Sequence, residues 1–135
     1  MARPPRPPLI RSRDGVSASC VALPAGDWPT VLDFLAQRLP ALSRSEWAER
    51  MAEGTVVDEQ ARALAVDAPY PRGNGQRLCY YRHVPHEPEP PHSEQIVFQD
   101  EHLVVADKPH FMPVTPGGRY VHSSLLVRLK RRLGI

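Results

Sequence analysis

The sequence predicts an α+β fold, with helices and short antiparallel strands in separate parts of the chain. Two segments, 28–39 and 43–53, carry apolar side chains at three- and four-residue spacing, which is typical of amphipathic helices. Short runs rich in β-branched and aromatic residues follow them. The 135 residues include 16 prolines, which cluster at 4–8, 69–71 and 85–91 and therefore mark a tail and linkers. This length accommodates one domain, or one and part of a second.

The first helix is expected over 28–39. Asp27 or Thr30 can cap its N-terminus, and Pro40 ends it because proline lacks an amide donor and clashes with the preceding turn. Its apolar face comprises Val31, Leu32, Phe34, Leu35 and Leu39.

The second helix is expected to begin at Ser43, because Ser43 and Glu46 have the spacing of a capping box. Its apolar side comprises Trp47, Ala48 and Met51. Gly54 suits the left-handed position that commonly terminates a helix. A small sheet should follow, because 55–58 and 63–66 are short apolar runs around a turn, and 77–84 is rich in strand formers.

The C-terminal part is expected to begin with a hairpin, because Asp100 and Glu101 separate the apolar runs 96–98 and 103–105. A loop rich in proline and glycine follows, and 123–133 has the pattern of a helix. The residues expected to face inward are Leu125, Leu126, Leu129 and Leu133, and those expected to face outward are Arg128, Lys130, Arg131 and Arg132.

Charge, cysteine content and the lack of long apolar stretches limit the classes of protein to which this chain can belong. The net charge of +2 does not by itself indicate nucleic-acid binding, although both ends of the chain are basic. Cys20 and Cys79 are expected to be free thiols in a reducing cytosol. No apolar stretch is long enough to span a membrane, and the N-terminus lacks the apolar core of a secretory signal, so a cytoplasmic protein is expected.

The most specific motif runs from Asp100 through Asp107-Lys108-Pro109 to Met112-Pro113 and Gly117-Gly118. This order of acidic turn, apolar strand, Lys-Pro and rigid loop resembles the first motif of the RluA-type pseudouridine synthases, which isomerise uridine in RNA. The family's common Ala-Gly after Lys-Pro is replaced here by His110-Phe111. Such enzymes use no cofactor, and their partner is rRNA or tRNA.

The N-terminal half resembles the αL-type RNA-binding module found at the front of many of these synthases. The resemblance implies that Arg44, and also Arg38 and Arg50, contact the RNA backbone, which sets affinity rather than sequence choice. Two departures reduce positive charge: Val31 stands where the family often has arginine, and Asp58-Glu59 where it often has Asn-Gly. The alternative for Ser43 and Arg44 is a helix cap with a solvated arginine.

Lys108 could neutralise a phosphate or hold the loop beside an active site, or it could simply end a strand before proline. The family's catalytic aspartate lies in a His-Arg-Leu-Asp motif, and no aspartate of this chain follows His-Arg-Leu. No catalytic residue is therefore assigned. His83, His86 and His92 lack cysteine partners or a helical context, so no metal site is expected.

These inferences predict a disordered basic arm over 1–14, an RNA-binding module over 15–84, a proline linker over 85–93, and the first piece of a mixed-sheet catalytic domain over 94–135. The expected function is that of a pseudouridine synthase truncated before its catalytic aspartate and inactive alone. Exposed apolar surface predicts self-association. Two alternatives remain: a non-catalytic RNA-binding protein, and an interaction protein that acts through the proline-rich run 4–8.

Overall fold

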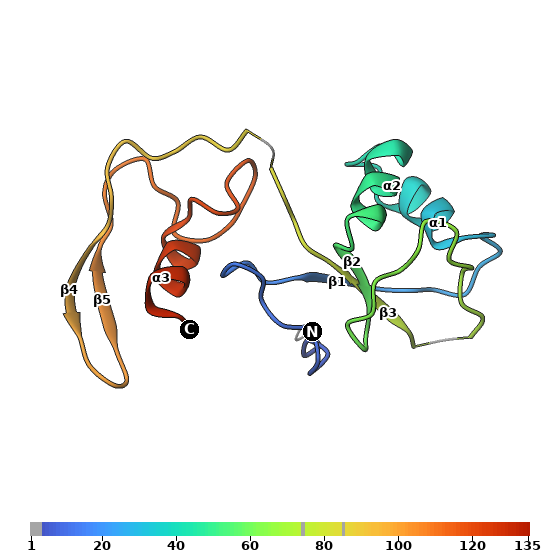
Figure 1. Ribbon diagram of the computed structural model, residues 1–135, viewed down its shortest axis with the longest axis horizontal. Helices are drawn as coiled ribbons and strands as arrows, with labels where there is room; N and C mark the ends of the chain where they lie inside the picture. Colours follow the sequence, from blue (N-terminus) through green and yellow to red (C-terminus); the bar gives the residue numbers. More distant parts are fainter. Residues whose placement is uncertain (1–3, 74, 85) are drawn as a thin grey trace. The chain divides into compact units, whose positions relative to one another are not determined.

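The structure is a computed structural model that describes residues 4–73, 75–84 and 86–135. Within these residues it contains three helices and two antiparallel sheets, as an α+β fold requires (Figure 1). The chain divides into two compact units: the first combines Met1–Arg11 with Ala18–Tyr81, and the second combines Ser12–Ser17 with Arg82–Ile135. None of the described helices has the length and apolarity that crossing a bilayer requires.

The first unit contains two capped helices, α1 (Val31–Arg38) and α2 (Arg44–Ala52). Both begin with a capping box, on Thr30 for α1 and on Ser43 for α2, so the expected cap of the second helix is confirmed. The first helix starts later than expected. Pro29 disfavours helical backbone for the residue before it, and Thr30 rather than Asp27 supplies the cap.

A three-stranded sheet completes the first unit. The strands β1 (Ser19–Ala22), β2 (Val56–Asp58) and β3 (Arg77–Tyr80) lie in the order β1-β3-β2 and are antiparallel. Strand β1 was not predicted from the sequence. The return strand expected over 63–66 is wrong, because only one bridge, Val57 with Ala63, forms there.

Side chains from both helices and the sheet form the core of the first unit. The most deeply buried of them are Val31, Phe34, Leu35, Val56 and Leu78. These residues lie on α1, β2 and β3, so the helices bury their apolar side chains against the sheet. This packing stabilises the helices, because isolated helices of this length are only marginally stable in water.

Residues 4–11, which belong to the segment expected as a disordered arm, lie against this sheet. Arg77 donates to the carbonyl of Pro5 at 2.8 Å, and the Tyr81 hydroxyl donates to the carbonyl of Arg11 at 2.6 Å. Ile10 is 5% exposed and packs with Ala18 and neighbouring side chains. A proline-rich segment can dock in this way because proline already restricts the unfolded chain, so ordering the segment costs little further conformational entropy. The first three residues of the expected arm lie outside the described residues.

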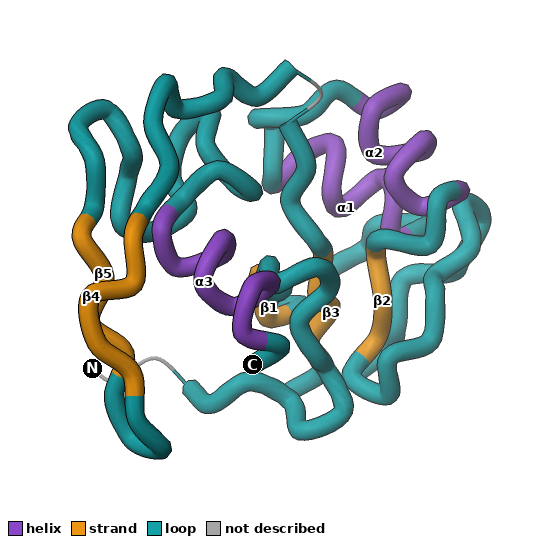
Figure 2. Tube along the Cα trace, turned by 60° about the vertical axis from the view of Figure 1, so that its left-hand side comes forward, coloured by secondary structure: helices purple, strands orange, loops and turns teal. Residues whose placement is uncertain are grey.

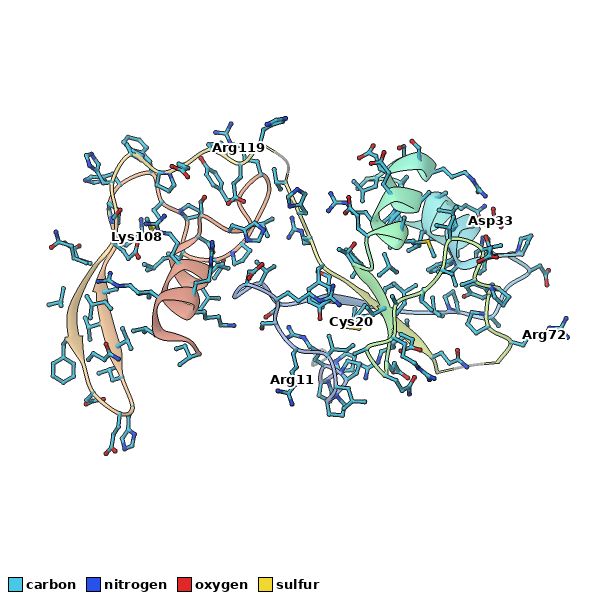
Figure 3. The ribbon with its side chains drawn as sticks, in the orientation of Figure 1. Arg11, Cys20, Asp33, Arg72, Lys108 and Arg119 are labelled. Atoms are coloured by element: carbon cyan, nitrogen blue, oxygen red, sulfur yellow. A yellow bond between two sulfur atoms is a disulfide. The ribbon has the colours of Figure 1, made fainter. Side chains whose placement is uncertain are left out.

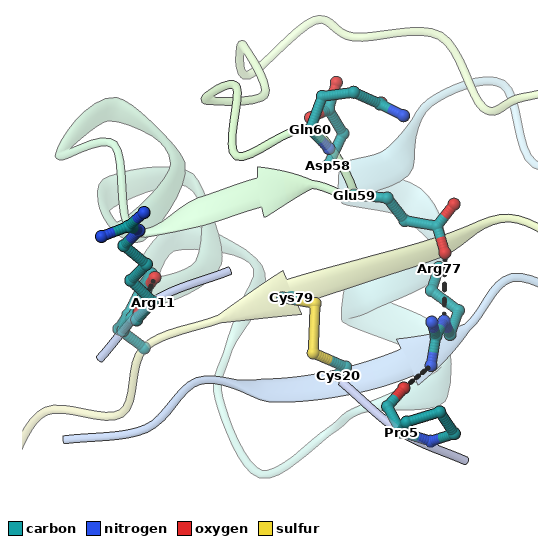
Figure 4. Close-up of a disulfide and its surroundings, with 9 residues drawn as sticks. Pro5, Arg11, Cys20, Asp58, Glu59, Gln60, Arg77 and Cys79 are labelled. Carbon is teal, nitrogen blue, oxygen red and sulfur yellow. Dashed lines mark hydrogen bonds and ion pairs between the residues drawn. A yellow bond between two sulfur atoms is a disulfide. The ribbon is translucent and has the colours of Figure 1, made fainter. Parts of the chain in front are cut away.

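Cys20 and Cys79 form a disulfide, so the prediction of two free thiols is wrong (Figure 4). The two residues are direct register partners on β1 and β3, with their Cα atoms 4.0 Å apart. The physical reason for the error is the missed strand: without β1, nothing placed Cys20 opposite Cys79.

The second unit contains the hairpin β4 (Gln95–Gln99) and β5 (Val104–Asp107) and the helix α3 (Leu125–Leu133) (Figure 2). The antiparallel hairpin and the Asp100 turn are confirmed, since Asp100 accepts the amides of His102 and Leu103. The expected faces of α3 are partly wrong. Val127 is its buried residue, whereas Leu126 is 41% exposed.

Arg128 was expected to face outward, but it is half-buried and its Nε donates to Glu94 at 2.6 Å. Glu94 is itself buried, and a buried carboxylate requires a charged or hydrogen-bonded partner. This pairing turns one basic residue of α3 toward its own unit.

A tight turn at 12–17 packs on α3. Arg13 and Val16 exchange backbone hydrogen bonds, and the two residues between them, Asp14 and Gly15, have φ values of 49° and 77°. Positive φ at both central positions is the geometry of a type I′ turn. A Cβ at Gly15 would lie 3.0 Å from the carbonyl oxygen of Val127, so only glycine fits this approach without displacing α3.

The proline-rich stretch expected as a linker over 85–93 is fastened to the second unit at Glu87. Its carboxylate accepts three consecutive backbone amides: Val121 at 2.8 Å, His122 at 2.9 Å and Ser123 at 2.6 Å. The division between the two units falls between Tyr81 and Arg82 rather than at the prolines. Pro85 itself lies outside the described residues.

Candidate RNA-binding surface

Arg44 is the first residue of α2, and it contacts Asp33 in the first turn of α1. Asp33 on α1 accepts the backbone amide of Thr30 at 3.0 Å and its hydroxyl at 2.7 Å through Oδ2. Its other oxygen, Oδ1, accepts Nη1 of Arg44 at 2.6 Å. One carboxylate, that of Asp33 (labelled in Figure 3), therefore completes the cap of α1 and orients the first residue of α2.

The charge at Asp33 is stabilised by these contacts. Hydrogen bonds from Thr30 and then from Arg44 hold the pKa of Asp33 below its ordinary value of 3.8, while desolvation opposes them. Arg44 keeps 59% of its side chain exposed despite the ion pair. A guanidinium has five donors, so one ion pair leaves capacity for a further anion.

Arg38 lies in the last turn of α1. Its guanidinium is 5.4 Å from the ring centroid of Trp28, a cation–π distance. Trp28 is held in turn by an edge contact with Phe34 and by a hydrogen bond from its indole N–H to Gln37. The charge of Arg38 thus sits on an aromatic surface at the exposed end of α1.

Arg50 lies in the last turn of α2 and is half-buried, and its carbonyl accepts the amide and the hydroxyl of Thr55. It is six residues beyond Arg44. At about 100° per residue, the two side chains leave α2 roughly 120° apart. The structure therefore joins Arg44 to α1 but does not gather the three predicted arginines into one cluster.

Lys108 belongs to the second unit, at the end of β5. Its ammonium donates to the carbonyls of Pro109 at 3.1 Å and Met112 at 2.9 Å. Figure 3 labels the Lys108 side chain. Of the roles left open by the sequence, this geometry favours holding the loop. Asp107, beside it, ends β5 and is exposed.

The first unit also contains a hollow of about 450 Å³ beside β2 and β3. Its charged lining is already paired: Arg62 with Asp58 at 3.2 Å, and Arg77 with Glu59 at 3.0 Å (Figure 4). Two acids and two bases give it no net attraction for phosphate. Within the described residues, no group of three or more histidine, cysteine, aspartate or glutamate side chains could hold a metal ion.

Two features of the second unit were not predicted from the sequence. Glu87 binds amides 34 to 36 residues further along the chain, and only its place among prolines set it apart. Phe111 adopts a φ of 65° and is 80% exposed. The sequence signal for Phe111 was the replacement of the resembled family's Ala-Gly by His110-Phe111.

Comparison with known proteins supports the same class as the Asp-Lys-Pro motif. The chain is 38% identical over 100 residues to a protein from Synechocystis sp. named as an uncharacterized RNA pseudouridine synthase, which covers 74% of this chain and 33% of that protein. It is 27% identical over 85 residues to RNA pseudouridine synthase 5 of Arabidopsis thaliana, covering 62% of this chain and 22% of that protein. No family model matches, and no solved structure matches.

The chain is thus a homologue of proteins named RNA pseudouridine synthases, an isomerase class that modifies RNA. Together with the motif around Lys108, this supports a relationship to the RluA-type synthases. The matched region spans about a third of the Synechocystis protein and about a fifth of the Arabidopsis protein.

Proposed function

We propose that this chain is the RNA-binding portion of an RluA-type pseudouridine synthase. The observation that carries the proposal is the 38% identity over 100 residues to a protein named as an RNA pseudouridine synthase. In this proposal the first unit is an αL-type RNA-binding module, and the second unit is the opening part of the catalytic domain. The substrate class is uridine in rRNA or tRNA.

The proposed RNA contact is the α1–α2 surface, defined here as the parts of the helix pair that carry Arg38, Arg44 and Arg50. Because these arginines do not form one cluster, each would contact a different phosphate. Arg44 is its best-placed member, because Asp33 orients it while most of its side chain stays exposed. An exposed ion pair contributes little to stability, because water screens both charges. A phosphate that forms a charge-assisted bidentate contact can therefore share or replace Asp33 at little cost.

Lys108 takes a supporting part in this proposal. Its contacts with the carbonyls of Pro109 and Met112 favour a role in shaping the loop after β5 over direct phosphate binding. The loop would then be correctly formed when the RNA arrives. The ammonium is exposed enough to add positive potential near that loop without making a fixed contact.

The chain alone is proposed to be inactive. Isomerisation requires a carboxylate that reaches a uracil flipped out of its stack, and none of the aspartates here follows His-Arg-Leu. Quantifying pseudouridine in nucleoside digests of RNA incubated with the chain tests this directly. Any pseudouridine above that of a protein-free control would contradict it.

A non-catalytic RNA-binding protein is the second candidate, favoured by the largely exposed guanidinium of Arg44, which can contact phosphate without any reaction. Reading the encoding DNA beyond codon 135 separates the two. A His-Arg-Leu-Asp run in any frame supports the synthase, and its absence from every frame supports the second candidate.

RNA binding itself is tested by filter binding to structured RNA at about 50 and about 200 mM salt. Contacts with phosphates release counterions, so affinity should fall as salt rises. Binding that does not respond to salt, or no binding at either concentration, would refute both candidates.

A further inference from the structure

Phe111 lies in the loop that follows β5, and it combines two unfavourable properties. Its φ of 65° falls in the left-handed region, which bulky residues other than glycine rarely enter. Its side chain is 80% exposed, so the ring gains almost no burial in return. Strain of this kind persists only where the surroundings impose it, and it concentrates at functional positions.

The residues around Phe111 hold its backbone in this left-handed conformation. Lys108 binds the carbonyls of Pro109 and Met112, one on each side of Phe111. Met112 is 2% exposed and anchors the loop in the second unit. The next two residues, Pro113 and Val114, accept the amides of Leu125 and Leu126, which fastens them to the start of α3.

The chemistry around the ring suits a nucleic acid. The His110 ring lies 6.2 Å from that of Phe111, centroid to centroid. No acidic residue occurs between Lys108 and Arg119. An exposed aromatic side chain near a second ring, in a loop that carries no negative charge, has the composition of surfaces on which unpaired bases stack.

We propose that Phe111, with His110 beside it, is a stacking contact for an unstacked nucleobase of the RNA. The proposal rests on the proposed function, since it requires that the chain binds RNA. It adds a contact in the second unit that reads the face of a base, whereas the arginines of the α1–α2 surface contact phosphate.

The test uses the complete 135-residue chain and two labelled probes: an oligouridylate, and an abasic ribose-phosphate oligomer of the same length. Phe111→Gly should weaken binding of the oligouridylate by about 5-fold or more, the usual loss on removing one stacked aromatic ring. It should leave binding of the abasic oligomer unchanged. Phe111→Tyr should retain the affinity, because it keeps the ring.

Phe98 offers a matched control, since it is a phenylalanine of the same unit that is 50% exposed on β4. Phe98→Leu should not change binding of either probe. Urea unfolding of Phe111→Gly supplies a second readout. Glycine relieves the left-handed strain and little burial is lost, so the unfolding midpoint should stay the same or rise.

The outcomes separate the two proposals. If the unmodified chain binds neither probe, the stacking contact is overturned, whereas the proposed function is decided separately by the filter binding to structured RNA. If the chain binds oligouridylate but Phe111→Gly has no effect, or has an equal effect on the abasic oligomer, only the stacking contact is overturned. A lower unfolding midpoint for Phe111→Gly would also overturn it, by showing that the ring packs within the protein.

Discussion

Asp33 and Arg44 link the two helices of the first unit through a 2.6 Å ion pair. Asp33 is also a member of the capping box of α1. The same carboxylate that accepts two hydrogen bonds from Thr30 accepts one from Arg44. The capping box of α1 is therefore also the device that orients the exposed guanidinium at the start of α2.

This relationship predicts a specific response to acid. Thr30 and Arg44 keep the pKa of Asp33 below 3.8, so Asp33 stabilises the fold above about pH 4 and this contribution is lost as the pH falls through the lowered value. Asp33→Asn should be less stable than the unmodified chain at pH 6, and the difference should shrink by pH 3. Urea unfolding followed by tryptophan fluorescence measures it, because Trp28 and Trp47 both lie in the first unit. A difference that stays constant with pH would contradict the role of the charge.

Gly15 supplies a test of the turn on α3. A side chain there suffers both a left-handed backbone and a contact of 3.0 Å with the carbonyl of Val127. Gly15→Ala should destabilise the second unit by about 2–4 kcal/mol, the sum of conformational strain and overpacking. Gly118 is the control, because its φ of 56° is also positive but nothing lies within 4 Å of an added Cβ. Gly118→Ala should cost only about 1 kcal/mol. Equal losses in thermal unfolding would show that the approach to α3 is unimportant.

The disulfide predicts that stability of the first unit depends on redox state. The bridge joins residues separated by 59 positions, and closing a loop of that size stabilises by up to about 4 kcal/mol in the chain-entropy account. Excess dithiol should therefore shift the urea unfolding of the oxidised protein to lower concentration. The double variant Cys20→Ser with Cys79→Ser should not respond. Two reactive thiols in the denatured, unreduced protein would contradict the bridge.

Glu87 predicts a local loss of order when its charge is removed. Burial alone would raise the pKa of Glu87, but the amides of His122, Ser123 and Val121 together lower it below 4.5. Glu87→Gln should cost about 2 kcal/mol, the scale of hydrogen bonds to a charged group. The protection of amides 121–123 against hydrogen exchange, relative to an unfolded chain at the same pH, should fall in this variant. It should also fall in the unmodified chain as the pH drops through the lowered pKa of Glu87. Glu89→Gln, an exposed neighbour, is the control; equal exchange in both variants would refute the clamp.

Local sequence patterns correctly predicted the parts of the fold that depend on residues close together in the sequence. The capping box of Ser43 and Glu46, the left-handed Gly54 and the Asp100 hairpin each involve residues only a few positions apart, and each is confirmed. Such features follow from backbone geometry and do not require knowledge of the rest of the chain.

Distant pairings could not be predicted in this way. The short strand Ser19–Ala22 becomes a strand only by pairing with β3, and the bridge between Cys20 and Cys79 depends on that pairing. Four residues of weak strand propensity give no signal alone, because strand preference is largely set by cross-strand neighbours.

The candidate site shows the same difference between features set by nearby residues and features set by distant contacts. Arg44 was predicted from a local resemblance, but its partner Asp33 emerged only when α1 and α2 were packed together. The left-handed backbone of Phe111 could not be predicted at all, since a bulky residue is the one least expected there. The contacts of Lys108 on either side explain it only after the loop is seen.

The most direct test of the central claim compares two sets of arginine variants in RNA titrations at several salt concentrations. Arg38→Gln, Arg44→Gln and Arg50→Gln combined should weaken binding and reduce the salt slope by roughly 2, because each phosphate that is no longer neutralised lowers the slope by about 0.7–0.9. The combined changes Arg11→Gln, Arg62→Gln and Arg72→Gln remove the same charge elsewhere in the first unit and should leave the slope nearly unchanged. Equal reductions in the two sets would show that RNA responds only to net charge, and would contradict an RNA-binding surface on α1 and α2.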